Sequence, residues 1–60
     1  MITLTSPWHY SLLGCTFPVG TVFIPQLGSA RRGRTVYSYA TPNGGHGECL
    51  IDDDVTPGQD

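Results

Sequence analysis

Two histidines and two cysteines are the residues of this sequence that could together hold a metal ion. His9 with Cys15 and His46 with Cys49 form the pattern H-x5-C followed by H-x2-C. Imidazole and thiolate are the ligand types of four-coordinate zinc sites, and a metal would supply folding energy to a short chain. The spacing is not that of a standard zinc finger, however, and four such residues arise easily by chance. We therefore expect no cofactor and keep a zinc-stapled module as the third interpretation of the sequence.

A catalytic cysteine is also a weak interpretation. A thiol nucleophile needs a base within hydrogen-bond reach and a further group that orients the base. His46 lies three residues before Cys49, and in an extended strand side chains at that spacing point to opposite faces. We expect a protein that is not an enzyme.

The charged residues are sorted along the chain. The three cations are Arg31, Arg32 and Arg34, no charged residue precedes them, and all five acids lie in residues 48–60. A guanidinium fork suits a carboxylate or a phosphate, which lysine binds less specifically. Because the net charge is -2, any binding of nucleic acid would have to come from this local patch.

The size and composition predict one small folded domain. A chain of 60 residues buries only about 60% of the surface that it exposes when unfolded. A hydrophobic fraction of 38% with 13% charged residues is not the signature of a disordered chain. We expect a single domain over residues 1–60, with an ordered core over 1–54 and an irregular tail over 55–60.

Proline and glycine exclude long helices, because few stretches of the chain are free of them. The segments between them are short and rich in valine, isoleucine, threonine and aromatic residues, which favour strands. The expected strands are residues 2–5, 10–17, 20–24, 34–40 and 48–52. The fold class that follows is all-β, a small twisted antiparallel meander of four to five short strands, with an SH3-like partly open barrel as one form of it.

A hairpin is predicted between the last two strands. Its tip is "TPNGGHG", in which Pro42 presets a turn and Asn43-Gly44 tolerates positive φ. Folding about this tip pairs residues whose numbers sum to about 88. Arg34 then lies opposite Asp54, residue 35 opposite residue 53 and residue 36 opposite residue 52. We therefore predict that Arg34 lies within ion-pair reach of the acidic run 52–54, which would pin the register of the hairpin.

Alternation along strand 34–40 divides its side chains between two faces. Val36, Ser38 and Ala40 share one face, and Tyr37 and Tyr39 lie on the other with Thr35. The tyrosine face is either a second packing layer or a binding platform, and packing is the more frequent outcome.

The first half of the chain has more large apolar side chains than a core of this size would hide. They are Trp8, Tyr10, Leu12, Leu13, Phe17, Phe23 and Ile24. Tryptophan, tyrosine and arginine are frequent anchors of protein interfaces. We therefore expect a non-enzymatic interaction module, namely a small subunit, adaptor or inhibitor that docks an uncharged apolar and aromatic surface on a larger protein or on a copy of itself. The expected partner-binding residues are Trp8, Tyr10, Phe23, Arg31, Arg32, Arg34, Tyr37 and Tyr39.

A small nucleic-acid-binding domain is the alternative function. Tyr37 and Tyr39 would stack on bases while the three arginines hold phosphates. The five acids oppose this interpretation.

The sequence predicts no membrane partner. "SLLGC" resembles a lipoprotein cleavage box, but the residues before it contain no Lys or Arg and are interrupted by Pro7 and His9. No run approaches the ~20 apolar residues of a membrane span. We expect a cytoplasmic protein with reduced cysteines.

Overall fold

The structure is a computed structural model that describes residues 1–28 and 31–59. Every regular element in these residues is a β-strand, so the all-β prediction is confirmed. The strands are β1 (Ile2–Thr3), β2 (Trp8–Tyr10), β3 (Cys15–Phe17), β4 (Val22–Pro25), β5 (Arg34–Ala40) and β6 (His46–Asp52). A helix long and apolar enough to cross a bilayer is absent from the described residues.

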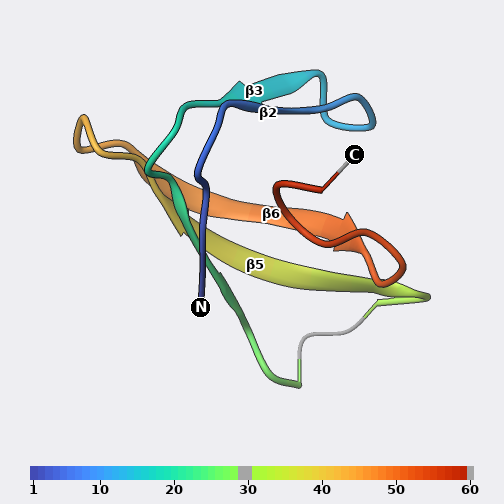
Figure 1. Ribbon diagram of the computed structural model, residues 1–60. Coiled ribbons are helices and arrows are strands. Elements are labelled where there is room, and N and C mark those ends of the chain that lie inside the picture. Colours follow the sequence, from blue (N-terminus) through green and yellow to red (C-terminus); the bar gives the residue numbers. More distant parts are fainter. Residues whose placement is uncertain (29–30, 60) are drawn as a thin grey trace.

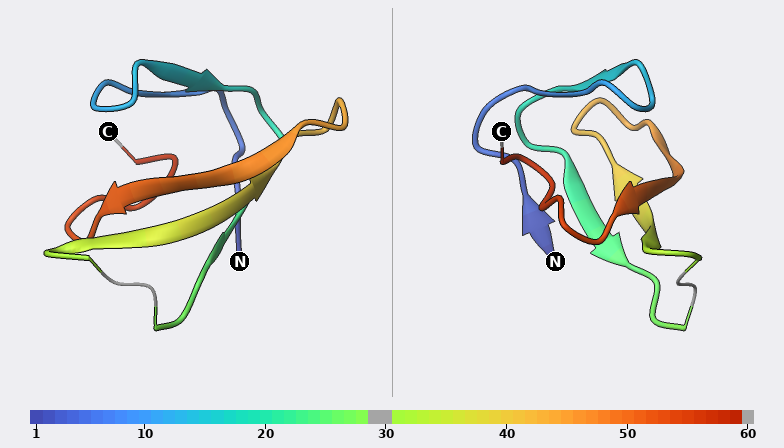
Figure 2. Two further views of the ribbon diagram at one scale, coloured as in Figure 1. Left: turned by 180° about the vertical axis from the view of Figure 1, so that it is seen from behind. Right: turned by 90° about the vertical axis from the view of Figure 1, so that its right-hand side faces the viewer.

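The strands form two layers. Four of them make an antiparallel sheet in the order β1-β4-β5-β6, and β2 and β3 form a separate antiparallel hairpin. The hairpin is inserted between β1 and β4 and lies over one face of the larger sheet (Figures 1 and 2). Because a sheet is stable only when one face is covered, the small hairpin supplies the second layer that the fold needs. An SH3-like barrel stays a prediction.

The predicted strand over residues 10–17 is wrong, because this segment is a hairpin and not one strand. The chain reverses after Tyr10, whose carbonyl accepts a hydrogen bond from Leu13 N–H at 3.1 Å, and Gly14 N–H donates to Ser11 at 3.1 Å. Gly14 has a φ of 63°, a conformation that glycine adopts without the cost of a side chain. The turn signal was the glycine within an otherwise apolar run. Elsewhere the predicted strands are present, and that over 34–40 has the expected bounds.

The β5–β6 hairpin forms as predicted, but its register is shifted by two residues. Arg34 lies opposite Asp52 and Thr35 opposite Ile51, so the pairing of Arg34 with Asp54 is wrong. The reason is the turn, which is centred on Pro42-Asn43 and ends at Gly44, with a φ of 93°. Thr41 N–H donates to Gly45 at 2.7 Å and closes a loop of three residues, the type in which a type I turn is followed by a left-handed glycine.

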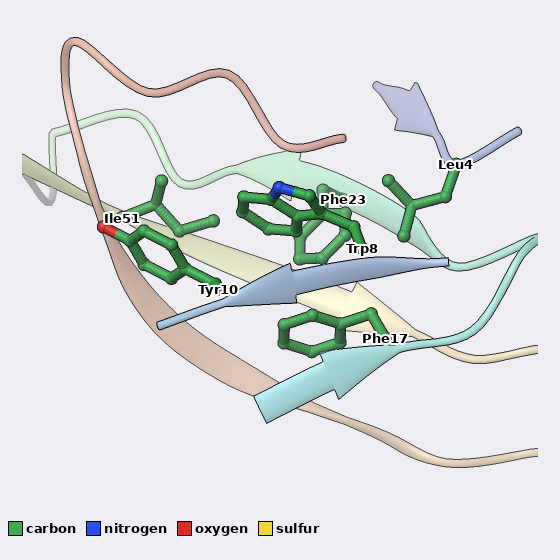
Figure 3. Packing of buried hydrophobic residues seen from close by; sticks show 6 residues of the cluster. All are labelled: Leu4, Trp8, Tyr10, Phe17, Phe23 and Ile51. Atoms are coloured by element: carbon green, nitrogen blue, oxygen red, sulfur yellow. The ribbon is translucent and has the colours of Figure 1, made fainter. Parts of the chain in front are cut away.

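The core lies between the two layers and is mostly aromatic (Figure 3). Its buried hydrophobic residues are Leu4, Trp8, Tyr10, Phe17, Phe23 and Ile51. Trp8 crosses Phe23 edge-on with ring centroids 5.8 Å apart, and Phe17 does the same at 5.0 Å. Such pairs contribute about 0.5–1.5 kcal/mol each beyond the burial of area. Aromatic contacts between the layers therefore position the hairpin on the sheet.

The chain after β6 contains turns and no strand as far as Gln59, and residue 60 of the predicted tail lies outside the described residues. This segment is nevertheless part of the packed structure. Val55 packs against the core and Pro57 is buried.

Candidate functional site

The arginines sit on a tight turn that leads into β5. Arg31 and Arg34 exchange two backbone hydrogen bonds, of 2.6 and 3.0 Å, and the two residues between them both have positive φ, 49° at Arg32 and 82° at Gly33. This is the conformation of a two-residue type I′ turn. Because Arg31 and Arg34 form a bridge pair, their side chains start from neighbouring positions on one face. The turn therefore concentrates positive charge where β5 begins.

Arg34 meets the acidic run, as predicted. Its Nε donates to Asp52 Oδ1 at 2.7 Å, and this hydrogen bond, together with the charge of Asp52, raises the pKa of Arg34. None of the hydrogen bonds among the described residues uses the Nη groups of Arg34. The outer edge of the guanidinium fork is therefore available for a second anion.

Two further hydrogen bonds hold this end of the sheet. The Asp52 N–H donates to the hydroxyl of Tyr10 at 3.1 Å, and Thr35 Oγ1 donates to Asp53 Oδ1 at 2.6 Å. The first bond joins the tip of the β2–β3 hairpin to β6, which are far apart in the sequence. The hairpin tip is thus fixed beside the arginine turn.

An apolar groove lies where the hairpin tip meets the sheet. Its volume is about 150 Å³, and it is lined by Tyr10, Leu12, Leu13, Arg34 and Leu50. The three leucines are exposed, at 61%, 38% and 36% in that order. Because exposed leucines next to one another have no place to bury their surface in the isolated chain, this groove is the candidate docking site. We call it the leucine groove.

The aromatic residues predicted to bind a partner are not on the surface. Trp8, Tyr10 and Phe23 are 4%, 6% and 0% exposed, and the half-buried Tyr37 and Tyr39 pack against the core. Phe23, Tyr37 and Tyr39 project from the sheet face that the β2–β3 hairpin covers. Trp8 and Tyr10 project from the hairpin toward them, so all five rings are removed from the surface. The surplus of large apolar groups is real, but its exposed members are aliphatic, including Leu12, Leu13 and Ile24.

The four residues of the zinc pattern are not gathered into a site. No group of three or more metal-binding side chains occurs within residues 1–28 and 31–59. His9 Nδ1 instead lies 2.8 Å from the hydroxyl of Thr16 on the neighbouring strand. His46 begins β6 and is exposed.

The two cysteines are both free thiols, one on each hairpin. Cys15 is exposed and Cys49 is half-buried. Burial raises the pKa of Cys49, and the nearby Cys15 raises it further. A raised pKa lowers the thiolate fraction, which is the opposite of what a nucleophile requires.

The groove residues that the sequence did not predict as a site are its three leucines, Leu12, Leu13 and Leu50. Leu50 shares a face of its strand with Glu48 and Asp52, and nothing in the sequence singles it out as a binding residue. In the sequence, Leu12 and Leu13 stand out only as part of an apolar excess within a predicted strand. A usable signal was present in Gly14, because a turn there would have placed both leucines at a hairpin tip.

Comparison with known proteins gives no relative. No family model, no curated protein and no solved structure matches this chain.

Proposed function

We propose that the protein is a non-enzymatic interaction module, a small subunit, adaptor or inhibitor, that docks on a larger protein through the leucine groove with arginines at its rim. The observation that carries the proposal is the exposure of three leucines around one groove. Docking would remove this apolar surface from water, which contributes about 25 cal/mol per Å².

The rim adds direction to the docking surface. Arg34 lines the groove. Arg31 and Arg32 lie on the turn that leads to Arg34, and both are exposed without an ion pair to any described residue. Charges at the rim of an interface steer association and fix orientation more than they add affinity. In this proposal the protein acts in the cytoplasm, where the free thiols of Cys15 and Cys49 would stay reduced, and its barrel-like meander serves as a rigid support.

Comparative affinity capture tests this function. The wild-type protein and the double variant Leu12→Ser, Leu13→Ser are immobilised at equal density, and bound proteins from the native cell extract are quantified by mass spectrometry. Leu27→Ser is the matched control, because Leu27 is 94% exposed and does not line the groove. We expect one or more proteins to be captured by the wild type and the control and lost at least about tenfold with the double variant. Equal capture by all three folded proteins would contradict the proposal.

Nucleic-acid binding is kept as a second function because Arg31 and Arg32 lack ion pairs among the described residues. Since Tyr37 and Tyr39 pack against the core, the binding would depend on phosphates alone. Fluorescence anisotropy with a single-stranded oligonucleotide at several salt concentrations tests it. A log–log slope of roughly -2, from about three phosphates on a single strand, would favour this function, and no binding at low salt would end it.

A further inference from the structure

The two edges of the four-stranded sheet differ in how open they are. One edge is β1, which has two residues, and the other is β6, which has seven. Natural sheets protect their edges with short strands, prolines, lysines or bulges. β1 is protected by its shortness, but β6, with the sequence HGECLID, contains no proline or lysine. Glu48 is the one charge in the middle of this edge.

The register identifies the backbone groups that point outward from β6. Asp53 N–H donates to Gly33 at 2.8 Å and Thr41 N–H donates to Gly45 at 2.7 Å, which fixes the alternation at both ends of the hairpin. In an antiparallel ladder the residues between hydrogen-bonded pairs direct their N–H and C=O groups away from the partner strand. These residues are His46, Glu48, Leu50 and Asp52.

The outward edge is open over three of these four residues. At Asp52 both groups are already used, because its N–H donates to Tyr10 and its carbonyl accepts from Val55 N–H at 2.9 Å. His46, Glu48 and Leu50 have no neighbouring strand on that side in the part of the chain that the structure describes, and all three are exposed. The open stretch thus offers three N–H donors and three carbonyl acceptors.

The open edge ends at the leucine groove. Leu50 is the last residue of the open stretch and also lines the groove with Leu12 and Leu13. A strand added beside β6 would carry its alternate side chains past this point, so one of them could enter the groove. An edge that supplies main-chain hydrogen bonds beside a pocket for a side chain is the arrangement by which proteins bind extended segments.

We propose that the edge of β6 is a strand-addition site, and that its occupant is an extended segment of the partner protein with a bulky aliphatic side chain for the leucine groove and a carboxylate for Arg34. The carboxylate is inferred from charge complementarity, because the Nη groups of Arg34 are unused among the described residues and Arg31 lies beside it. This inference rests on the proposed function and specifies how the partner binds.

The charge of Glu48 disfavours a second copy of the chain as the occupant. The open stretch runs from His46 to Leu50 and is centred on Glu48. Antiparallel pairing of two copies about a two-fold axis, using all of this stretch, places Glu48 opposite Glu48 of the other copy. Like charges directly opposite on neighbouring strands are destabilising.

Peptide display with amide exchange tests the site. A library of random linear peptides is selected against the full chain, and an enriched peptide is synthesised and titrated while amide hydrogen exchange is followed by NMR. We expect enriched peptides to combine β-branched residues, one bulky aliphatic residue and an acid. The amides of His46, Glu48 and Leu50 should slow at least about tenfold on binding, because they become hydrogen-bonded. The Cys49 amide, which already faces β5, is the internal control and should change little.

A pair of variants at one position separates the edge from the groove. Glu48→Pro removes the outward N–H without removing a bond to β5, and Glu48→Gln keeps the N–H and removes only the charge. We expect Glu48→Pro to weaken peptide binding at least about tenfold and Glu48→Gln to keep it. If Glu48→Pro does not fold, the exchange data on the wild type decide.

The strand-addition site would be excluded if the library gave no enriched peptide. It would also be excluded if the chain formed a concentration-dependent dimer whose edge amides are protected without peptide.

Two further results would exclude the strand-addition site without deciding the proposed function. They are a bound peptide that leaves the three edge amides unchanged and a folded Glu48→Pro variant that keeps full affinity. In these two cases, loss of partner capture with the double variant Leu12→Ser, Leu13→Ser would leave the proposed function intact. Unchanged partner capture with the double variant would contradict the proposed function as well.

Discussion

The two hairpins of this protein are held in different ways. The β5–β6 hairpin has seven residue pairs in one ladder and an ion pair at its open end, so local interactions define it. The β2–β3 hairpin has three pairs, and its position depends on aromatic rings that contact the sheet below (Figure 3). An isolated short hairpin is at best marginally stable in water. The β5–β6 hairpin therefore acts as the scaffold, and the β2–β3 hairpin is ordered by packing and carries Leu12 and Leu13, two of the three exposed leucines of the groove.

The largest expected effect comes from breaking the packing of the second hairpin. Trp8→Ala should lower the free energy of unfolding by about 3–5 kcal/mol, because it removes a buried ring and leaves a cavity between the layers. A protein of this size cannot tolerate much of that loss. Urea denaturation followed by far-UV circular dichroism measures the change. Leu12→Ala on the same hairpin is the control, since Leu12 is 61% exposed, and it should cost less than about 0.5 kcal/mol. Similar losses for the two variants would mean that packing does not hold the hairpin.

A smaller effect is expected where the two hairpins are joined by a hydrogen bond. Tyr10→Phe keeps the ring in the core and removes the hydroxyl that accepts from Asp52 N–H. The free energy of unfolding should fall by about 0.5–1.5 kcal/mol. Amide exchange should accelerate at Asp52 and remain unchanged at Ile51, whose N–H belongs to the β5–β6 ladder. Equal acceleration at both residues would show that the loss is global and that the bond has no local role.

The smallest effect is a pH dependence of stability that comes from Cys49, on the β5–β6 hairpin. Burial raises the pKa of Cys49 above the usual 9.0, so the folded state retains its proton at a pH where the unfolded state has begun to lose it. This contribution to stability is present below pH 9 and disappears as the pH rises through the folded pKa. Between pH 8 and pH 10.5 the melting temperature of the wild type should therefore fall more than that of Cys49→Ala. Below pH 8 the melting temperatures of the two proteins should change with pH in the same way. A parallel fall of both melting temperatures above pH 8 would contradict the role of Cys49.

The sequence predicts the β5–β6 hairpin well and the β2–β3 hairpin poorly. Strand 34–40, a turn after it and a contact between Arg34 and the acidic run 52–54 follow from alternation, turn chemistry and charge. The error of two residues in the register came from folding the chain about Gly44, the middle of the predicted tip, whereas the three-residue loop that forms is centred on Asn43. Composition does not fix the length of the loop, because a left-handed glycine at Gly44 suits both a two-residue turn on Asn43-Gly44 and the three-residue loop. In the other hairpin, the apolar run from Tyr10 to Phe17 concealed a reversal that only Gly14 marked.

The candidate site also has one part that the sequence predicts and one part that it does not. The arginine turn was visible as a cluster of cations, and its proximity to the acidic run was predicted. The leucine groove was not, because Leu50 and the tip residues Leu12 and Leu13 lie in separate parts of the chain and meet only when the hairpin packs on the sheet. The residues chosen as aromatic anchors instead form the core.

The sequence by itself determined the β-rich architecture, the long hairpin and the pairing of opposite charges at its open end, since each depends on residues that are neighbours in the chain or across one turn. Tertiary structure decided which apolar side chains are buried. Alternation assigns the side chains of a strand to two faces, but it does not say which face a second layer will cover. Here the β2–β3 hairpin covers the aromatic face. The aromatic rings become the core for that reason. Leu12 and Leu13 at the tip of the β2–β3 hairpin and Leu50 on the edge strand β6 stay exposed around the groove.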